Sequence, residues 1–129
     1  MEKALELTTV EAKNERHAQL MEELKADIEA YENGSKDSLF DSLALHKLQT
    51  YAGGDYAAKL EFVEKLVEDS LPTSEWMAGN GVEWTDEITT VPGGLWPRAH
   101  LPVNAAGYDY IKASEDTARE LGVEILLNS

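Results

Sequence analysis

Cysteine is absent from this chain and basic residues are few. No Cys occurs in the 129 residues, which excludes disulfides, thiolate catalysis, iron–sulfur clusters and Cys-based zinc sites. Lys and Arg number 11 against 25 Asp and Glu, for a formal net charge of -14, so nucleic acids and anionic membrane surfaces would be repelled. Long apolar runs and a signal-peptide pattern are also lacking. We expect no nucleic-acid partner and no membrane span, while the compartment stays undetermined.

What is present indicates a globular chain. Hydrophobic residues make up 43% of the sequence, with three Trp and five Tyr, and disordered chains usually lack this content. A length of 129 residues allows one substantial core and is short for two ordinary domains. We therefore predict a single domain over residues 1–129.

The first predicted helix begins at a capping box, Thr8–Glu11. Apolar side chains then recur at steps of four, four and three and form one stripe: Leu20, Leu24, Ile28 and Tyr31. The pair Asn33–Gly34 supplies a left-handed stop. The sequence thus predicts an amphipathic helix between these signals.

Two more helices are predicted before residue 80. Ser35 or Ser38 can cap the second, which ends before Gly53–Gly54, and Asp55 can cap the third. The third has the cleanest apolar face, formed by Leu60, Val63, Leu66, Val67 and Leu71. Pro72 lacks a backbone donor, so this helix either kinks there or restarts with Pro72 in its first turn.

The C-terminal part mixes weak strands with a clear helix. Val82–Thr85 and Ile88–Val91 are short β-prone runs, a turn follows at residues 92–94, and residues 95–107 are predicted to be loop. A helix over Asp109–Leu121 ends at Gly122 and leads into a predicted buried strand, Val123–Leu127. The predicted fold class is mainly α with a small β component (α+β): a helical bundle-like unit with a short strand pair and a C-terminal αβ step. That last strand needs neighbours, so we expect the chain to be an internal fragment of a larger protein.

Few residues carry recognisable chemistry. His17, His46 and His100 are scattered without metal-ligand spacing, so no metal site is predicted. We expect His17 on a helix surface and His46 near a core edge. The pair Gly53–Gly54 matches no phosphate-binding loop, and the many carboxylates fit solvated helix faces.

The segment from Trp96 to Pro102 is the strongest site candidate. It is braced by proline, as binding loops often are, and it contains Arg98 and His100. Two positions apart in an extended segment, these side chains would point the same way and could engage a carboxylate or phosphate. The alternative is structural: Trp96 fills the core while Arg98 and His100 pair with nearby carboxylates.

The order of motifs resembles one enzyme family. The motifs begin with Tyr51–Asp55, a helix containing Glu68-Asp69-Ser70, and the segment Glu75–Trp84. The segment Arg98-Ala99-His100-Leu101-Pro102 follows them. This resembles FAD-dependent fumarate reductases, flavocytochromes c and urocanate reductases, whose corresponding loop reads R-x-H-R-P. The likeness covers residues 12–129, including the final helix and strand, Gly107–Asn128. Leu101 departs from the family's Arg, and Val103–Ala106 departs from its Gly-rich continuation.

The resemblance implies a flavoprotein that reduces the activated C=C bond of a small carboxylic acid, such as a fumarate- or urocanate-like substrate. It implies FAD in the parent protein, with Arg98 and His100 near the flavin or a domain interface. The family's principal catalytic residues and dinucleotide fingerprint lie outside the matched region, so catalytic residues here are unknown. We expect the fragment alone to be inactive and to bind no FAD tightly. Its partners would be the remainder of the flavoprotein and, through it, a dicarboxylate-like substrate; the parent would be a bacterial cytoplasmic or exported protein.

Two other functions fit the residues. The chain could be a non-catalytic acidic helical module whose amphipathic faces bind a protein partner. It could also be a small self-sufficient enzyme that uses Arg98, His100 and a carboxylate. The flanking reading frame discriminates these readings, because a GxGxxG strand–turn–helix upstream supports the flavoprotein.

Overall fold

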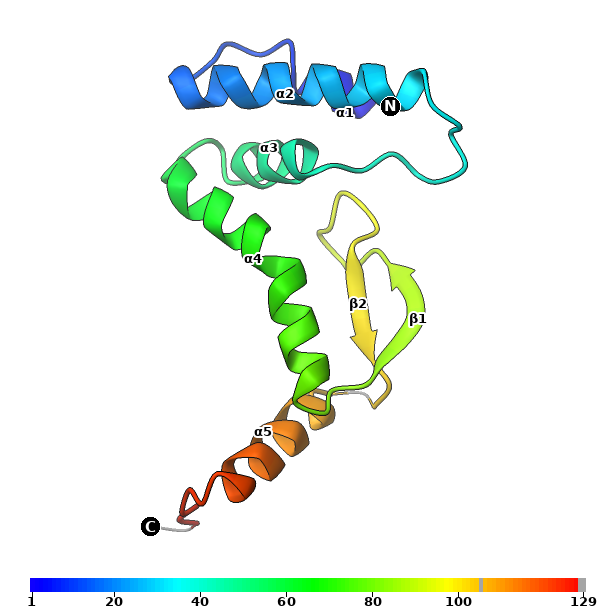
Figure 1. Ribbon diagram of the computed structural model, residues 1–129. Coiled ribbons are helices and arrows are strands. Elements are labelled where there is room, and N and C mark those ends of the chain that lie inside the picture. The colour runs from blue at the N-terminus through cyan, green and yellow to red at the C-terminus, as the bar shows by residue number, and fades with distance from the viewer. Residues whose placement is uncertain (105, 128–129) are drawn as a thin grey trace. The chain divides into compact units, whose positions relative to one another are not determined.

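The computed structural model describes residues 1–104 and 106–127; Ala105 of the predicted loop and Asn128 of the terminal motif lie outside them. Its elements are α1 (Glu2–Glu6), α2 (Glu15–Glu32), α3 (Leu43–Gly53), α4 (Leu60–Gly79), β1 (Trp84–Thr89), β2 (Ala99–Pro102) and α5 (Tyr108–Glu120) (Figure 1). The predicted mainly α fold with a small β component is confirmed. The chain forms two compact units, the N-terminal unit Met1–Ser70 and the C-terminal unit Leu71–Ser129, and the boundary falls within α4.

The helix predicted from the capping box begins later than expected. Thr8 and Thr9 instead end α1, because their Oγ1 atoms donate to the carbonyls of Leu5 and Glu6 at 2.8 and 2.9 Å. The N-cap of α2 is Asn14, whose extended backbone lets its side chain accept from the amide of His17 at 2.9 Å. The capping-box prediction at residues 8–11 was therefore wrong, because the threonine hydroxyls bond to carbonyls at the end of α1 and do not cap α2.

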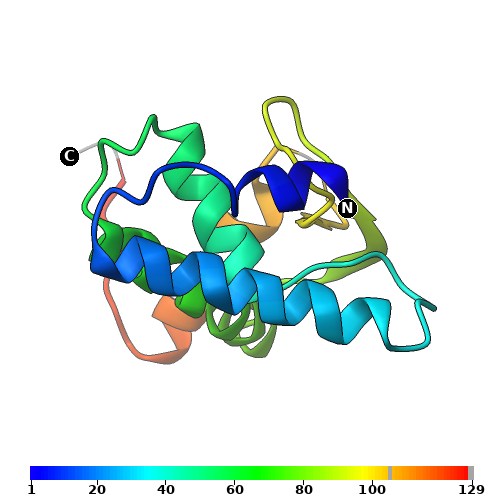
Figure 2. The ribbon, with the colours of Figure 1, turned by 90° about the horizontal axis from the view of Figure 1, so that it is seen from above.

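The core of the N-terminal unit is formed mainly by α2, α3 and the first half of α4. The helices α2 and α3 pack against each other (Figure 2). The predicted α2 stripe is confirmed for Leu20, Leu24 and Ile28, which are buried, while its last member, Tyr31, is half-buried. From the other helices, Leu45, Leu48 and Val67 are almost fully buried. Each such side chain contributes roughly 1.5–3 kcal/mol through its removal from water.

The starts of α3 and α4 also differ from the prediction. Ser42, and not Ser35 or Ser38, caps α3, because its Oγ accepts from the amide of Leu45 at 3.1 Å. Asp55 has φ 53°, whereas an N-cap needs extended backbone. The helix α4 consequently begins at Leu60.

A buried lysine organises an ion-pair network inside the N-terminal unit. Lys47 is 5% exposed, and its Nζ lies 2.6 Å from a carboxylate oxygen of Glu68 and 3.7 Å from one of Glu64. Arg16 from α2 binds the same Glu64 oxygen at 2.7 Å. The hydrogen bonds that Arg16 donates, to Glu64 first and then to Glu23, raise the pKa of Arg16. The network joins α2, α3 and α4 through charge-assisted hydrogen bonds.

The helix α4 continues through Pro72 and ends where predicted. Pro72 lies inside it, so the helix does not restart there. Pro72 has no N–H, so it cannot donate to the carbonyl of Glu68. At the far end, Asn80 Nδ2 donates to the carbonyl of Trp76 at 2.7 Å and Gly81 has φ 97°. The predicted Asn80–Gly81 stop is confirmed.

The β component is a hairpin, of which the sequence predicted the first strand and missed the second. The two β-prone runs merge into β1, and β2 lies within the segment that was predicted to be loop. The strands pair antiparallel, with Trp84 opposite Pro102 and Ile88 opposite His100. The loop prediction for residues 99–102 was wrong because β2 is short and depends on a partner distant in sequence.

The final helix is confirmed, whereas the strand after it is not formed. Gly122 (φ 75°) and Val123 donate their amides to the carbonyls of Arg119 and Ala118 at 3.0 and 2.9 Å, which is the Schellman arrangement. Residues 123–127 are exposed and lie in no strand. A strand requires a neighbouring edge, and neither described strand pairs with this segment. Within the described ranges, none of the helices combines membrane-spanning length with a sufficiently apolar sequence.

Candidate functional site

The predicted site residues lie at the second strand of the hairpin. His100 is an exposed residue inside β2, and Arg98 is half-buried just before the strand begins. Alternation along an extended backbone places side chains two apart on the same face of the sheet. The hydrogen-bond ladder of the hairpin therefore positions His100, and Arg98 directly precedes the paired strand.

Trp84 is the residue that connects His100 to the rest of the C-terminal unit. Its ring centroid lies 6.3 Å from that of His100 at an interplanar angle of 72°, and 6.0 Å from that of Tyr110 on α5. Its indole N–H donates to the carbonyl of Ser74 on α4 at 3.3 Å. In the sequence, Trp84 belongs to a β-prone run and ends the family motif Glu75–Trp84, and neither indicated a contact with His100. An aromatic residue in a β-prone run predicts a strand position, but it does not predict which side chains the ring contacts.

An irregularity in β1 lies beside this contact. The pairing shifts between Trp84 and Ile88, so β1 bulges relative to β2. Bulges often occur next to functional sites, where they redirect a side chain. Here the bulge lies between Trp84, which is opposite Pro102, and Ile88, which is opposite His100. Trp84 therefore contacts the His100 ring diagonally across the strand pair.

A buried aspartate closes the loop between β2 and α5. Asp109 is 8% exposed, and its carboxylate accepts from the backbone amide and the side-chain amide of Asn104, both at 2.8 Å. The amide of Val103 also donates to the carbonyl of Glu83 at 3.0 Å. These bonds hold the end of the hairpin against the start of α5. No pattern in the sequence marks Asp109 as buried.

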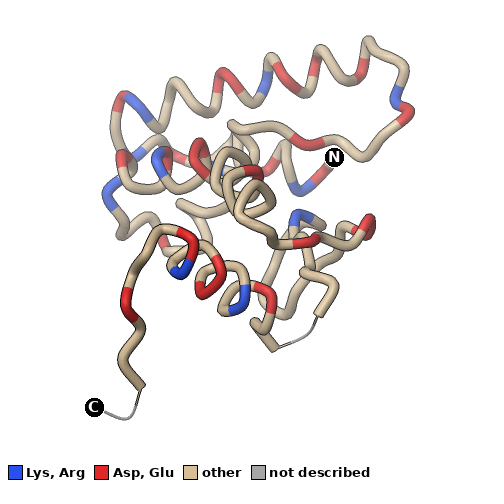
Figure 3. The backbone as a smooth tube through the Cα atoms, turned by 60° about the horizontal axis from the view of Figure 1, so that its bottom comes forward, with Lys and Arg blue, Asp and Glu red and all other residues tan. Residues whose placement is uncertain are grey.

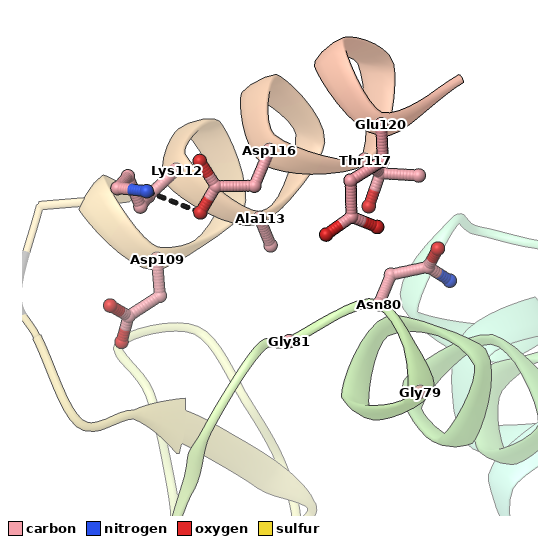
Figure 4. Close-up of a pocket in the computed structure, with 9 residues that line it drawn as sticks. All are labelled: Gly79, Asn80, Gly81, Asp109, Lys112, Ala113, Asp116, Thr117 and Glu120. Carbon is pink, nitrogen blue, oxygen red and sulfur yellow. Dashed lines mark hydrogen bonds and ion pairs between the residues drawn. The ribbon is translucent and has the colours of Figure 1, made fainter.

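An acidic cavity of about 390 Å³ lies between α5 and the end of α4. Its lining includes Asp109, Asp116 and Glu120, and Figure 4 shows Asp116 pointing to Lys112, with which it forms an ion pair. In the described ranges no group of three or more His, Asp or Glu is placed to hold a metal ion. The pKa of Lys112 is raised, and the largest cause is the hydrogen bond that its ammonium group donates to Asp116.

A second, apolar cavity of about 290 Å³ lies near the acidic one and shares several residues with it. Its lining includes Trp76, Met77, Val82, Tyr110, Ala113 and Leu121. Trp76 and Leu121 are exposed, so the cavity opens as a groove beside α5. Small-molecule sites are commonly apolar with a few polar groups at the edge.

The other two histidines lie in the N-terminal unit. His46 is half-buried on α3, as expected of a core-edge position. His17 was predicted on a helix surface, and this was wrong, because it is 0% exposed. Burial lowers the pKa of His17, and the nearby Lys13 lowers it further. His17 lies three and seven residues before Leu20 and Leu24 on α2, so the helical period places it on the same buried face.

A few Lys and Arg residues are interspersed among the Asp and Glu residues of α2 and α5 (Figure 3). On α2, Arg16 pairs with Glu23 at 2.6 Å, and on α5 Arg119 pairs with Glu115 at 2.6 Å. Most of these side chains are solvent exposed, so each pair stabilises its helix only slightly. The helix carboxylates behave as the solvated faces that the sequence predicts.

Comparison with known proteins relates these residues to an oxidoreductase. The chain is 31% identical to NADH:acrylate oxidoreductase of Vibrio harveyi over 119 residues, a match that covers 82% of this chain. The same match covers 12% of the relative, so the chain spans a small part of that protein's length. No family model matches the chain, and no solved structure matches it significantly.

Proposed function

We propose that these residues form part of an FAD-dependent oxidoreductase that reduces an activated C=C bond of a small carboxylic acid, fumarate- or urocanate-like. The observation that carries this proposal is the 31% identity to NADH:acrylate oxidoreductase across 82% of the chain. Acrylate contains a C=C bond conjugated to a carboxylate, which is the same type of activated bond. The 12% coverage of that relative supports the view that the active site needs further parts of the protein.

The hairpin residues are chemically suited to one wall of such a site. Arg98 supplies a guanidinium that can bind a carboxylate with two parallel hydrogen bonds. His100 is exposed, and its imidazole can donate to a second anionic or carbonyl oxygen. Trp84 and Tyr110 add aromatic surface beside His100. This set fits the edge of a flavin or a bound carboxylate.

Bound FAD would supply the hydride chemistry, and the protein would supply orientation and electrostatics. In this proposal Arg98 and His100 hold the substrate carboxylate or the flavin edge. Trp84 keeps the imidazole in place through the ring contact and excludes water from one side of it. The hydrogen bond from Trp84 to the Ser74 carbonyl fixes the indole in turn.

A first test asks whether the chain retains cofactor by itself. The sequence contains no GxGxxG fingerprint for the FAD pyrophosphate, so we expect no tight binding when the purified chain is titrated with FAD. Flavin fluorescence and equilibrium dialysis measure this directly. Tight stoichiometric binding would contradict the proposed division of the cofactor site between this chain and other parts.

A second test uses the natural gene product that contains these residues. We expect it to carry flavin and to oxidise a reduced electron donor when acrylate, fumarate or urocanate is added. His100→Ala should raise KM for the carboxylate about tenfold, because one hydrogen bond to a charged group is lost. His46→Ala, in the other unit, is the matched control and should leave KM unchanged. A gene product without flavin would contradict the proposal and favour the acidic interaction module.

A further inference from the structure

The best-defined polar feature outside the proposed site is the start of α2. Asn14 caps the helix and accepts from the amide of His17 at 2.9 Å. In return, Nδ1 of His17 accepts from the amide of Lys13 at 3.1 Å. The two residues thus form a reciprocal cap that resembles a capping box, with His in the position usually held by Glu or Gln.

The protonation state of His17 follows from these contacts. Because Nδ1 accepts the Lys13 amide, the neutral ring must carry its proton on Nε2. The Nε2 atom is buried and has no hydrogen-bond partner among the described residues. His17 itself is 0% exposed. The ring therefore has no access to water and one hydrogen bond, which depends on an unprotonated Nδ1.

Among the described residues, the charged group that acts on the ring is a cation, and no carboxylate pairs with the imidazole. Tyr51 on α3 lies edge-on at 5.3 Å between ring centroids, and Tyr56 in the α3–α4 turn lies at 5.4 Å. Lys13, the charged neighbour that affects the ring, is itself a cation over the Tyr56 ring at 5.1 Å. From α4, the carboxylate of Glu64 is already engaged by Arg16 and Lys47.

Tyr56 is held against His17 by a strained turn. Asp55 and Tyr56 have φ 53° and 57°, so two consecutive non-glycine residues adopt the left-handed conformation. Such residues persist only where surrounding contacts hold them. The contacts of the Tyr56 ring with His17, Tyr51 and Lys13 supply that support.

We propose that the His17 cap is an acid-sensitive latch that fixes the start of α2 and the Asp55–Tyr56 turn. A proton added at Nδ1 turns the acceptor into a donor that faces the donor amide of Lys13. It also places a buried cation at a helix N-terminus, where the macrodipole opposes positive charge. Protonation therefore opens the cap and releases the turn, while the rest of the N-terminal core stays packed.

The sign of the pH dependence follows from linkage. The pKa of His17 is lower in the closed cap than the ordinary value of about 6.5 that applies once the ring reaches water. The closed cap is therefore fully favoured above that value and weakens as the pH falls below it. The opening equilibrium should rise about tenfold for each unit of pH below about 6.5, until the closed form also takes up the proton.

The test is amide hydrogen exchange and NMR on the intact chain between about pH 7.5 and about pH 5.5. We expect protection of the Lys13 and His17 amides, corrected for intrinsic exchange, to fall with pH before protection in the middle of α2 falls. His17→Gln keeps an acceptor for the Lys13 amide without titrating, so its cap should be insensitive to pH. His46→Gln should behave as the unmodified chain.

Two results would overturn the proposal. One is protection at Lys13 and His17 that does not change across this pH range; the other is the same change in His17→Gln. If His17→Gln fails to fold, the unmodified chain still decides the matter. In that chain the Lys13 amide resonance must shift with the same midpoint as the His17 ring protons, and a different midpoint rejects the latch.

Discussion

The N-terminal and C-terminal units bury their apolar side chains to very different extents. In the N-terminal unit, Leu20, Leu24, Leu45, Leu48 and Val67 are all less than 2% exposed. In the described part of the C-terminal unit, the buried apolar residues are Val82 and Ala113. Large apolar side chains there remain at the surface, including Trp76 at 68% and Leu121 at 77% exposure.

This difference shows that two kinds of interaction stabilise one chain. The N-terminal unit depends on core burial, which contributes broadly in proportion to the area removed from water. The C-terminal unit depends on a short ladder, the Asp109–Asn104 hydrogen bonds and the aromatic contacts of Trp84. Its exposed apolar surface is also of the kind that marks interaction sites. Substitutions can test this contrast directly.

The largest effect is expected from the N-terminal core. Leu45→Ala should lower the free energy of unfolding by about 2–5 kcal/mol, because it leaves a cavity among fully buried side chains. Leu121→Ala, at an exposed position of the other unit, should change it by no more than about 0.5 kcal/mol. Urea unfolding followed by circular dichroism measures both. Equal effects of the two substitutions would remove the contrast.

A smaller effect is expected at the aromatic contacts of the C-terminal unit. Trp84→Ala should cost about 2 kcal/mol, less than for a fully buried Trp, because the ring is only half-buried. Trp76→Ala is the matched control, and since its side chain is largely exposed it should cost about 0.5 kcal/mol or less. Thermal unfolding of both variants provides the comparison. If Trp76 proves the more important residue, the hairpin contacts do not stabilise this unit as argued.

The smallest effect should be the same in both units. Lys65 pairs with Asp69 on α4, and Lys112 pairs with Asp116 on α5, each four residues apart on a helix. Exposed pairs of this type contribute little and are screened by salt. Lys65→Met and Lys112→Met should leave the urea midpoint within measurement error at physiological salt. A clear shift for either one would mean that its pair is less exposed to solvent than the structure indicates.

Periodicity and stop signals predicted the helices well, whereas caps were predicted poorly. The stripe of Leu20, Leu24 and Ile28 is a repeated signal, so an error at one position cannot hide it. A cap depends on one hydrogen bond, and several polar residues compete for it. Asn14 took the role that Thr8 or Thr9 was expected to have. The burial of His17, by contrast, follows the same period as the stripe, because it lies three residues before Leu20.

Contacts between distant segments were the part that sequence could not provide. The sequence predicted Arg98 and His100 as site residues. The strand β2 and the contact between the Trp84 and His100 rings form only when residues 84–89 pair with residues 99–102. The burial of Asp109 likewise depends on the path of the loop before α5. The predicted strand at residues 123–127 shows the converse, because its β-prone sequence forms no strand without a partner edge.

The bulge in β1 determines which changes of length the hairpin can accept. Between the pairs Trp84–Pro102 and Ile88–His100, β1 has residues 85–87 where β2 has only residue 101. Removing two residues from this stretch would give a regular ladder with Trp84 still on the face of His100. Removing one would leave two residues opposite residue 101, which is the count of an ordinary bulge with one unpaired residue. In an evolving lineage, deletions of one or two residues here should therefore survive even where the Trp84–His100 contact is used.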